Sequence, residues 1–281
     1  MLHVGMDMHK RFSVVTVIDG SGKEVIRGKR LNNNEDEIRA FFEGLDSEAG
    51  VVLEAGGNWN WMCDLLDEMG LENRLCHPLK TKATAQARIK TDKIDSSILA
   101  HLLRMDFVPE AYKPDTETRH LRELLRFRAS MVKVRTSTKN KVHALPARPN
   151  IANPYSDLFG KKGMAYLEGL SLAPVYRNAM DGHLRLIAAL NLEMERADKL
   201  VGKLRAGSKE AVLLETIPGV GPILALTILA EIGDVGRFYS AKHLASYAGL
   251  VPSTRQSGTI AKHGHITKQG SAWLRRRYTR R

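Results

Sequence analysis

The chain has little cysteine, few aromatic residues and no long uncharged apolar run. Of 281 residues only two are cysteines, Cys63 and Cys76, and they form no CxxC spacing. This excludes a disulfide framework and argues against a zinc site, so both are interpreted as reduced packing residues of a cytosolic protein. The longest apolar run, residues 217–230, is too short to span a bilayer and is interrupted by prolines and glycines. With no signal-peptide pattern in the first ten residues, we expect a soluble, cytoplasmic protein without a membrane partner.

Two long segments also lack acidic residues. Residues 126–156 contain seven Lys/Arg and no Asp/Glu, and residues 235–281 contain ten Lys/Arg and no Asp/Glu. Since the net charge is +12, the rest of the chain is net negative by about five charges. Basic charge segregated in this way is typical of a nucleic-acid-binding surface, although a basic run can also be a solvated face.

The length of 281 residues and the hydrophobic content of 43% predict two domains with real cores and a connecting arm. Hydrophobic alternation and turn residues predict strands over residues 2–7, 12–18, 23–31, 50–54 and 73–77. Amphipathic helices are predicted over residues 35–45 and 59–69. The order βββαβαβ favours an α/β fold in which helices flank a mixed sheet.

Four acidic residues lie at strand ends or on one helix face, where they could form a metal site. Asp92 and Asp95 head the apolar-periodic segment 90–104 and share one helix face, because they are three residues apart. Two carboxylates on one face make half of a magnesium site, although acids in a first helical turn also serve as caps. Asp7 and Glu54 each end a predicted strand. If those strands are neighbours, both carboxylates emerge at the same rim of the sheet, where the helix can pack across them.

The order of Asp7 in GMD, Glu54 in LEAGG and the aspartates of TDKID resembles the ribonuclease-H-like, RuvC-like DEDD core of Holliday-junction resolvases. More closely, it resembles a family of bacterial insertion-sequence transposases, the bridge-RNA-guided recombinases. That resemblance implies a DEDD catalytic domain over residues 1–110. Four carboxylates brought together would repel one another without a cation, so we expect two Mg²⁺ ions that clamp the attacking and leaving oxygens of a phosphoryl transfer.

A helical arm is predicted after this domain, over residues 111–208. Its first helix covers residues 116–142, and prolines at positions 146, 149 and 154 are expected to end it in an irregular segment. A second helix over residues 174–204 should pack back on the first, and oligomerisation through the arm is a hypothesis. The first helix is predicted to contact phosphates through Arg126, Arg128, Lys133, Arg135, Lys139 and Lys141.

Residues 209–281 form the third predicted part, a small and mostly α-helical domain. Its IPGVGP motif resembles a helix-hairpin-helix, in which Gly219 and Gly221 permit the tight turn and Pro222 begins the second helix. Free backbone N–H groups at that helix start can contact a phosphate without reading bases. A simple corner between two helices is the alternative.

The segment 243–258 is predicted as a helix that runs into an irregular loop. A donor-rich loop follows, in which Lys262 and Lys268 are expected to contact the phosphates of a nucleic acid. From the residues alone, a loop serine is ordinarily just solvated. The resemblance assigns more, because the transposase family has a nucleophilic serine in a run similar to GLVPSTRQSG, and the matching residue is Ser257. A serine nucleophile would store the phosphodiester energy in a phosphoserine ester.

The resemblance therefore implies a nucleoid-associated DNA transposase or recombinase. Members of the family are similar in using a structured non-coding guide RNA that pairs with target and donor DNA. The resemblance also implies a dimer or tetramer with composite active sites. Two alternatives stay open. One is a metal-dependent junction nuclease or DNA invertase, and the other is an inactive nucleic-acid-binding remnant. The remnant is considered because related transposases look as though they continue beyond the final WLRRRYTRR.

Overall fold

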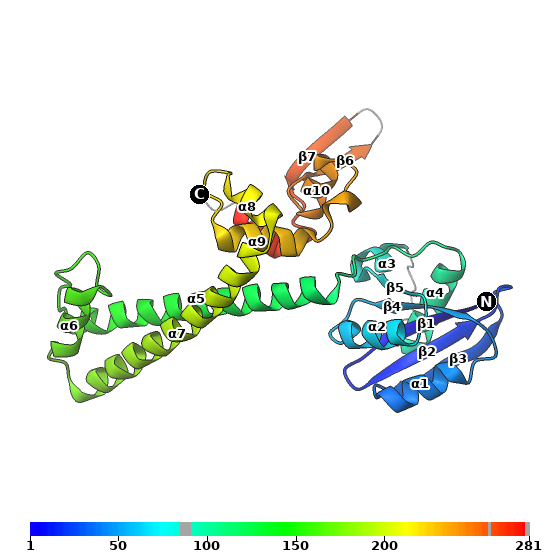
Figure 1. The fold of residues 1–281 in the computed structure, drawn as a ribbon, viewed down its shortest axis with the longest axis horizontal. Coiled ribbons are helices and arrows are strands. Elements are labelled where there is room, and N and C mark those ends of the chain that lie inside the picture. Colours follow the sequence, from blue (N-terminus) through cyan, green and yellow to red (C-terminus); the bar gives the residue numbers. More distant parts are fainter. Residues whose placement is uncertain (85–90, 258–259, 279–281) are drawn as a thin grey trace. The chain divides into compact units, whose positions relative to one another are not determined.

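A computed structural model describes residues 1–84, 91–257 and 260–278 of the chain. It divides into two compact units, Met1–Lys113 and Pro114–Arg281, and each is described by itself (Figure 1). The finer division at residues 110 and 208 stays a prediction. Within the described ranges, no helix combines the length and apolar character needed to cross a membrane.

The first unit is built on one mixed five-stranded sheet. Its strand order is β3-β2-β1-β4-β5, with antiparallel pairing among β1 to β3 and parallel pairing of β4 with β1 and β5. The predicted α/β fold and the order of its elements are confirmed. The strands are β1 Leu2–Met8, β2 Phe12–Ile18, β3 Glu24–Asn32, β4 Ala49–Glu54 and β5 Asn73–Cys76.

Alternating side chains give this sheet two differently covered faces. Val4 and Met6 of β1, with Val51 and Leu53 of β4, pack against helices α1 (Glu35–Glu43) and α2 (Trp59–Glu68). Val52, one residue out of phase, packs on the opposite face against helix α4 (Asp92–Arg104). A short helix, α3 (Pro78–Thr84), follows β5 and was not predicted.

The second unit contains two long helices that pack along each other, α5 (Thr116–Ala147) and α7 (Pro174–Ala206), with α6 (Lys161–Gly169) between them in sequence. Both long helices were predicted. The expectation that Pro146 lies outside the first helix was wrong, because α5 extends to Ala147 and buries Pro146. A proline in the last turn removes one hydrogen bond and leaves the preceding turns intact.

The remaining elements form a small helical cluster and a hairpin. Helices α8 (Lys209–Glu215), α9 (Pro222–Ile232), η1 (Val235–Arg237), α10 (Ala241–Tyr247) and α11 (Ala272–Tyr278) surround a core that includes Leu226, Ile228 and Leu274. The irregular loops predicted before and after Ser257 were wrong: β6 (Pro252–Ser257) and β7 (Ile260–Ile266) pair antiparallel. Because this hairpin is largely polar, it lacks the apolar alternation by which strands are recognised.

Candidate active site

Asp7 and Glu54 lie on the same face of the sheet because of strand periodicity. Asp7 is two residues after Gly5 and Glu54 is two residues after Val52, so both side chains point to the face that α4 covers. The strands β1 and β4 are parallel neighbours, and their last paired residues are Met6 and Leu53. The condition set by the sequence analysis, that the two strands are neighbours, is therefore met.

Helix α4 brings the other two acids to this edge. It begins at Asp92, and Thr91 caps it by accepting a hydrogen bond from the Ile94 N–H on its side-chain oxygen, at 3.3 Å. The capping requirement is thus met by a threonine, which weakens the interpretation of Asp92 as a cap. Among the buried residues of this helix are Leu99, Leu102 and Leu103.

A glycine sets how closely α4 approaches the sheet. A Cβ atom on Gly5 would lie 2.0 Å from the Ser96 carbonyl oxygen and 2.4 Å from the Ala100 nitrogen. Any side chain at this position would therefore push the helix off β1. A buried hydrogen bond of 2.8 Å between the Thr16 and Ser96 hydroxyls ties the same helix to β2.

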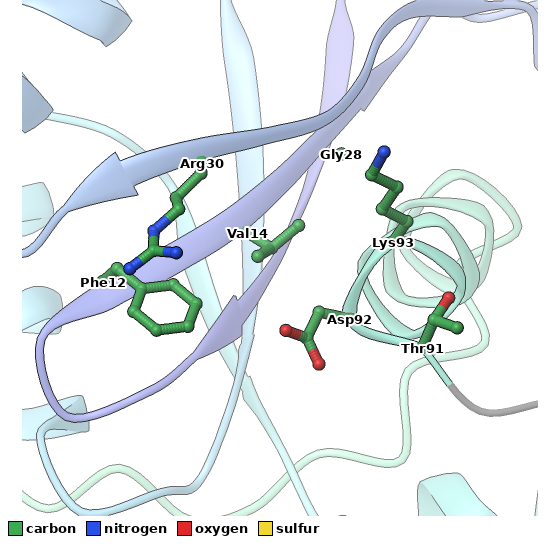
Figure 2. Close-up of a pocket in the computed structure, with 7 residues that line it drawn as sticks. All are labelled: Phe12, Val14, Gly28, Arg30, Thr91, Asp92 and Lys93. Atoms are coloured by element: carbon green, nitrogen blue, oxygen red, sulfur yellow. The ribbon is translucent and has the colours of Figure 1, made fainter.

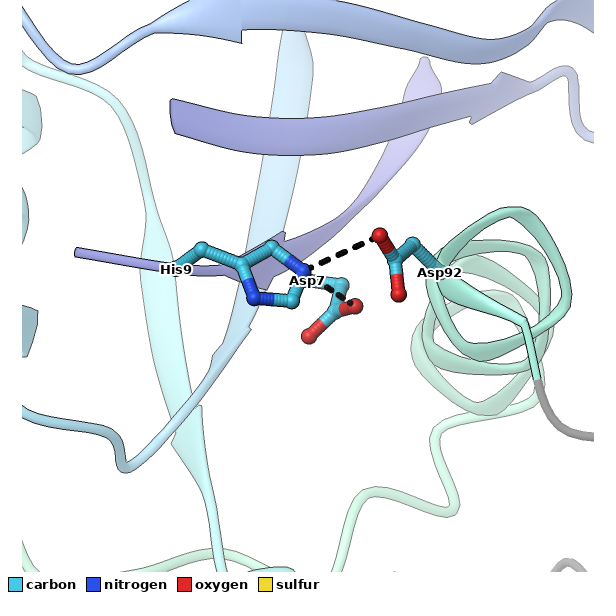
Figure 3. Close-up of side chains that lie close together, drawn as sticks. All are labelled: Asp7, His9 and Asp92. Atoms are coloured by element: carbon cyan, nitrogen blue, oxygen red, sulfur yellow. Dashed lines mark ion pairs between the residues drawn. The ribbon is translucent and has the colours of Figure 1, made fainter. Parts of the chain in front are cut away.

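Three side chains converge at the head of α4 (Figure 3). His9 Nε2 lies 3.4 Å from an Asp7 oxygen and 3.2 Å from an Asp92 oxygen. One potential ligand atom from each of the three residues lies within 4.8 Å of the others. The histidine ring also packs against Phe12, with ring centroids 4.5 Å apart.

The acids act on one another electrostatically. The pKa of the Asp7 carboxyl is raised by burial; His9 opposes this shift, and the negative charges of Asp92, Asp95 and Glu54 add to it. The other three acids proposed from the sequence thus all act on the carboxyl of the fourth, Asp7. Glu54 and Asp95 are not in the tight three-residue group, whose ligand atoms come from Asp7, His9 and Asp92.

The residues fit a divalent cation. Within the part of the chain that is described, the buried Nε2 atom of His9 makes no hydrogen bond, although it lies between two carboxylate oxygens. An imidazole nitrogen beside two carboxylates is a suitable ligand set when it is unprotonated, and oxygen-rich surroundings favour Mg²⁺ or Mn²⁺ over softer ions. His9 was missed by the sequence analysis, and its one signal is the position two residues after Asp7, directly after the end of β1.

Ser257 belongs to the second unit. Its backbone ends β6 and pairs with Ile260 of β7, whereas its side chain lies outside the described part of the chain. On β7, Lys262 is exposed and pairs with Arg255 in register, and Lys268 follows the strand with a φ of 55°. The catalytic role of Ser257 and the phosphate contacts of the two lysines stay predictions.

Several basic residues of α5 have partners inside their own unit. The Arg126 guanidinium contacts the Glu231 carboxylate at 3.0 Å, Arg128 pairs with Asp198, and Arg135 donates to the Asn191 side chain at 3.0 Å. Lys139 lies over the Phe159 ring, 4.3 Å from its centroid. Lys133 and Lys141 are exposed. Phosphate binding by these six residues stays a prediction, and the two exposed lysines are the most accessible of them.

The turn between α8 and α9 has the backbone that the IPGVGP motif predicts. Gly219 has a φ of +86°, a conformation that favours glycine, and Pro222 is the first residue of α9. Gly221 caps α9, and no atom of the described residues lies within 4 Å of a Cβ built on either glycine. This exposed helix start is open to a phosphate, and its function as a helix-hairpin-helix stays a prediction.

The mixed sheet, with acids at the ends of β1 and β4 and on α4, defines a ribonuclease-H-like DEDD domain followed by a largely helical region. Two family models agree with this class. Residues 4–145 match the model of the DEDD domain of IS110 transposases, and residues 211–279 match that of the IS116/IS110/IS902 transposase family. The chain belongs to this family of insertion-sequence transposases.

Similarity to individual relatives extends over nearly the whole chain. It is 27% identical to a putative transposase of Sinorhizobium fredii, over 97% of this chain and 68% of the relative. It is 26% identical to the transposase for insertion sequence element IS1111A of Coxiella burnetii, over 97% and 74% of the two chains. A pilin gene-inverting protein of Moraxella bovis is 52% identical over 66 residues, which are 23% of this chain and 20% of that protein.

Proposed function

We propose that this chain cuts and rejoins DNA strands, with Asp7, Glu54, Asp92 and Asp95 as ligands of two Mg²⁺ ions and Ser257 as the nucleophile. The observation that carries the proposal is the convergence of the acids at one edge of the sheet, where burial and then the charges of the other acids raise the pKa of the Asp7 carboxyl. Such a cluster favours a cation, and membership of the transposase family makes a DNA phosphodiester the natural substrate.

The proposed reaction balances as a transesterification. The Ser257 hydroxyl oxygen forms a bond to phosphorus while the bond from phosphorus to a nucleoside oxygen breaks. The serine proton passes to a base, and the leaving oxygen takes up a proton. Bound divalent ions would stabilise the charge on the phosphate oxygens. The phosphoserine ester conserves the bond energy, so that a second strand end can reverse the step and reseal the DNA.

The metal assignment is tested with a supercoiled plasmid that carries the native DNA flanking the gene. Asp7→Asn should reduce strand cleavage at least about 100-fold, because one metal ligand loses its charge. EDTA should have the same effect and added Mg²⁺ should reverse it. Asp46→Asn, a change on an exposed loop, is the matched control. Full cleavage by the Asp7 variant would refute the assignment.

The nucleophile is tested by trapping. When the reaction is stopped with detergent, the protein should remain covalently attached to DNA, and Ser257→Ala should lose the adduct. Unchanged cleavage by Ser257→Ala would indicate a metal-dependent junction nuclease that uses water. Salt-sensitive DNA binding without cleavage under any metal condition would indicate a binding remnant.

A second candidate function is inversion of a chromosomal segment. It is favoured by the local identity of 52% with a pilin gene-inverting protein. The same flanking DNA placed on both sides of a reporter distinguishes the two outcomes. A transposase should excise or move the reporter, whereas an invertase should return it in the opposite orientation on an intact plasmid.

We infer that a non-coding guide RNA and further copies of the chain complete the active complex. RNA that copurifies with the chain and is required for cleavage would support the first inference. For the second, Asp7→Asn and Ser257→Ala proteins are mixed after separate purification. If one copy supplies the acids and another supplies the serine, the mixture should regain part of the activity that both variants lack.

A further inference from the structure

A hollow of about 590 Å³ lies beside the acidic cluster in the first unit (Figure 2). This volume is in the range of about 300–1,000 Å³ that small-ligand pockets have. Three elements form it, namely the start of β2, the second half of β3 and the head of α4. Its lining consists of Phe12, Val14, Gly28, Arg30, Thr91, Asp92 and Lys93.

The strand geometry explains why the hollow is there. Phe12 and Val14 alternate in phase with Thr16, whose hydroxyl contacts α4, so all three face the helix side of the sheet. Pairing between β2 and β3 is irregular near Gly28, which has a φ of +58°. A Cβ atom at Gly28 would lie 2.4 Å from Lys93 Cγ, so the glycine lets the first turn of α4 approach β3.

The hollow combines a flat apolar surface with positive charge. The Arg30 guanidinium lies over the Phe12 ring, 3.8 Å from its centroid, and Val14 is buried beneath. Lys93 lines the opposite side, and both cationic side chains belong to exposed residues. Asp92 points into the hollow and also contacts His9, so one carboxylate joins the hollow to the acidic cluster (Figures 2 and 3).

These groups match the parts of a nucleotide. A base can stack on an aromatic ring or on the plane of an arginine, and a phosphate is bound by Arg and Lys. A free anion would not use the apolar floor, and an apolar ligand would not use the two cations. The carboxylate of Asp92 would repel a phosphate placed deep in the hollow, so the phosphates belong at the Arg30 and Lys93 sides.

We propose that this hollow holds one nucleotide of the DNA strand that is cut, next to the phosphate that reaches the acidic cluster. The inference rests on the proposed function in that DNA is the substrate at this edge of the sheet. The Arg30 guanidinium, which the Phe12 ring supports, binds the base by stacking, and Arg30 and Lys93 hold the flanking phosphates. Phe12, Arg30 and Lys93 thereby fix the position of the strand at the acids and take no part in bond breaking.

The test is photocrosslinking of the full chain to a 12-nucleotide oligodeoxythymidine that contains 4-thiothymidine. It is done in EDTA, so that neither metal binding nor cleavage is required for the readout. Mass spectrometry should place a crosslink on the tryptic peptide that begins at Phe12. Phe12→Leu and Arg30→Gln should each lower the yield of this crosslink at least about fivefold, because stacking of one base contributes about 1–3 kcal/mol.

Arg27→Gln is the matched control, because it removes the same charge from the same strand at an exposed residue outside the lining. The inference would be overturned if the full chain gave no crosslink at Phe12, or if Arg30→Gln lowered the yield no more than Arg27→Gln did. Stronger crosslinking at Phe12 by an oligouridine of equal length containing 4-thiouridine would also overturn it, since RNA would be the occupant. If Asp7→Asn leaves cleavage intact while the Phe12 crosslink persists, the metal assignment fails and this inference stands.

Discussion

At the scale of single residues, Asp7 has an environment that favours the proposed chemistry and disfavours the folded metal-free protein. Its side chain is 14% exposed, and three other carboxylates raise its pKa in addition to the effect of burial. The ionised form of such a carboxyl destabilises the folded protein as long as no positive charge lies beside it. A bound cation removes this penalty. On the proposed metal assignment, the residue therefore reduces the stability of the metal-free protein and is stabilised when the cation binds.

Asp7→Asn should stabilise the metal-free protein at neutral pH and abolish its stabilisation by Mg²⁺. The melting temperature without metal should rise by a few degrees, on the order of the shift expected for 1 kcal/mol. Thermal unfolding with EDTA and with Mg²⁺ measures both effects. Asp46→Asn should change neither, and an Asp7 variant that still gains stability from Mg²⁺ would contradict the assignment.

The same comparison has a defined pH dependence. Because the pKa of Asp7 is raised above its ordinary value of 3.8 on folding, the protonated carboxyl favours the folded state. This contribution is fully present below pH 3.8 and is lost as the pH rises through the folded-state pKa. The stability advantage of Asp7→Asn should therefore grow between acid and neutral pH in EDTA. A difference that stays constant across that range would be inconsistent with the shift.

Glu231 is a second residue with an unusual environment. It is the only charged residue of helix α9, and its side chain is 5% exposed. Its two carboxylate oxygens contact Arg126 at 3.0 Å and the Ser271 hydroxyl at 2.8 Å. It thereby links α5 and α9 to the residue preceding α11. Loss of one partner of a buried charge pair is far more damaging than loss of a surface pair.

Glu231→Ala should lower the free energy of unfolding by about 2–4 kcal/mol, below the upper range for buried pairs because the Arg126 side chain is 40% exposed. Urea unfolding monitored by circular dichroism provides the measurement. Glu195→Ala breaks an exposed pair with Lys199 and should change the stability by less than about 0.5 kcal/mol. Equal effects of the two substitutions would show that the buried pair stabilises the protein no more than an exposed pair does.

At the scale of elements, the site depends on how closely α4 lies on the sheet. Gly5→Ala should shift this helix, because the added methyl group meets backbone atoms at 2.0 Å and 2.4 Å. We expect a loss of about 1–3 kcal/mol in stability and a weaker stabilisation by Mg²⁺, since α4 carries Asp92 and Asp95. Calorimetry with and without Mg²⁺ measures both quantities.

Gly57→Ala serves as the control, because no atom lies within 4 Å of a Cβ built there. If Gly5→Ala fails to fold, Thr16→Val is the milder variant, since it removes only the hydroxyl contact with Ser96. A Gly5 variant with an unchanged Mg²⁺ response would show that the approach of α4 does not set the geometry of the acids.

The elements that could be predicted from sequence are those with a strong apolar period. Strands β2 and β4 are almost continuous runs of buried residues, and such short apolar runs bounded by turn residues predict strands. That Asp7 and Glu54 share an edge depends on the pairing of β1 with β4, which the sequence leaves open. The hairpin β6–β7 has no comparable apolar run, and its sequence therefore predicts a loop. His9 could not be assigned, because its role depends on a neighbour 83 positions further along the chain, Asp92, which only the fold brings close.

At the scale of the whole molecule, charge is divided between the two units. Met1–Lys113 contains 15 Lys/Arg and 18 Asp/Glu, whereas Pro114–Arg281 contains 28 Lys/Arg and 13 Asp/Glu. The first unit is thus slightly negative and the second strongly positive. Since phosphate neutralisation dominates nucleic-acid affinity, the second unit should supply most of the binding and the first the metal-dependent chemistry.

Separate expression of the two units tests this division. Fragment 1–113 has its own apolar clusters on both faces of its sheet, so it should unfold cooperatively and gain stability from Mg²⁺. Fragment 114–281 should retain most of the affinity of the full chain for duplex DNA, with a similar slope of log affinity against log salt. Fluorescence anisotropy between about 50 and 200 mM salt gives this slope. Tight, salt-sensitive binding by fragment 1–113 and none by fragment 114–281 would reverse the assignment, because affinity would then not follow the net charge of the units.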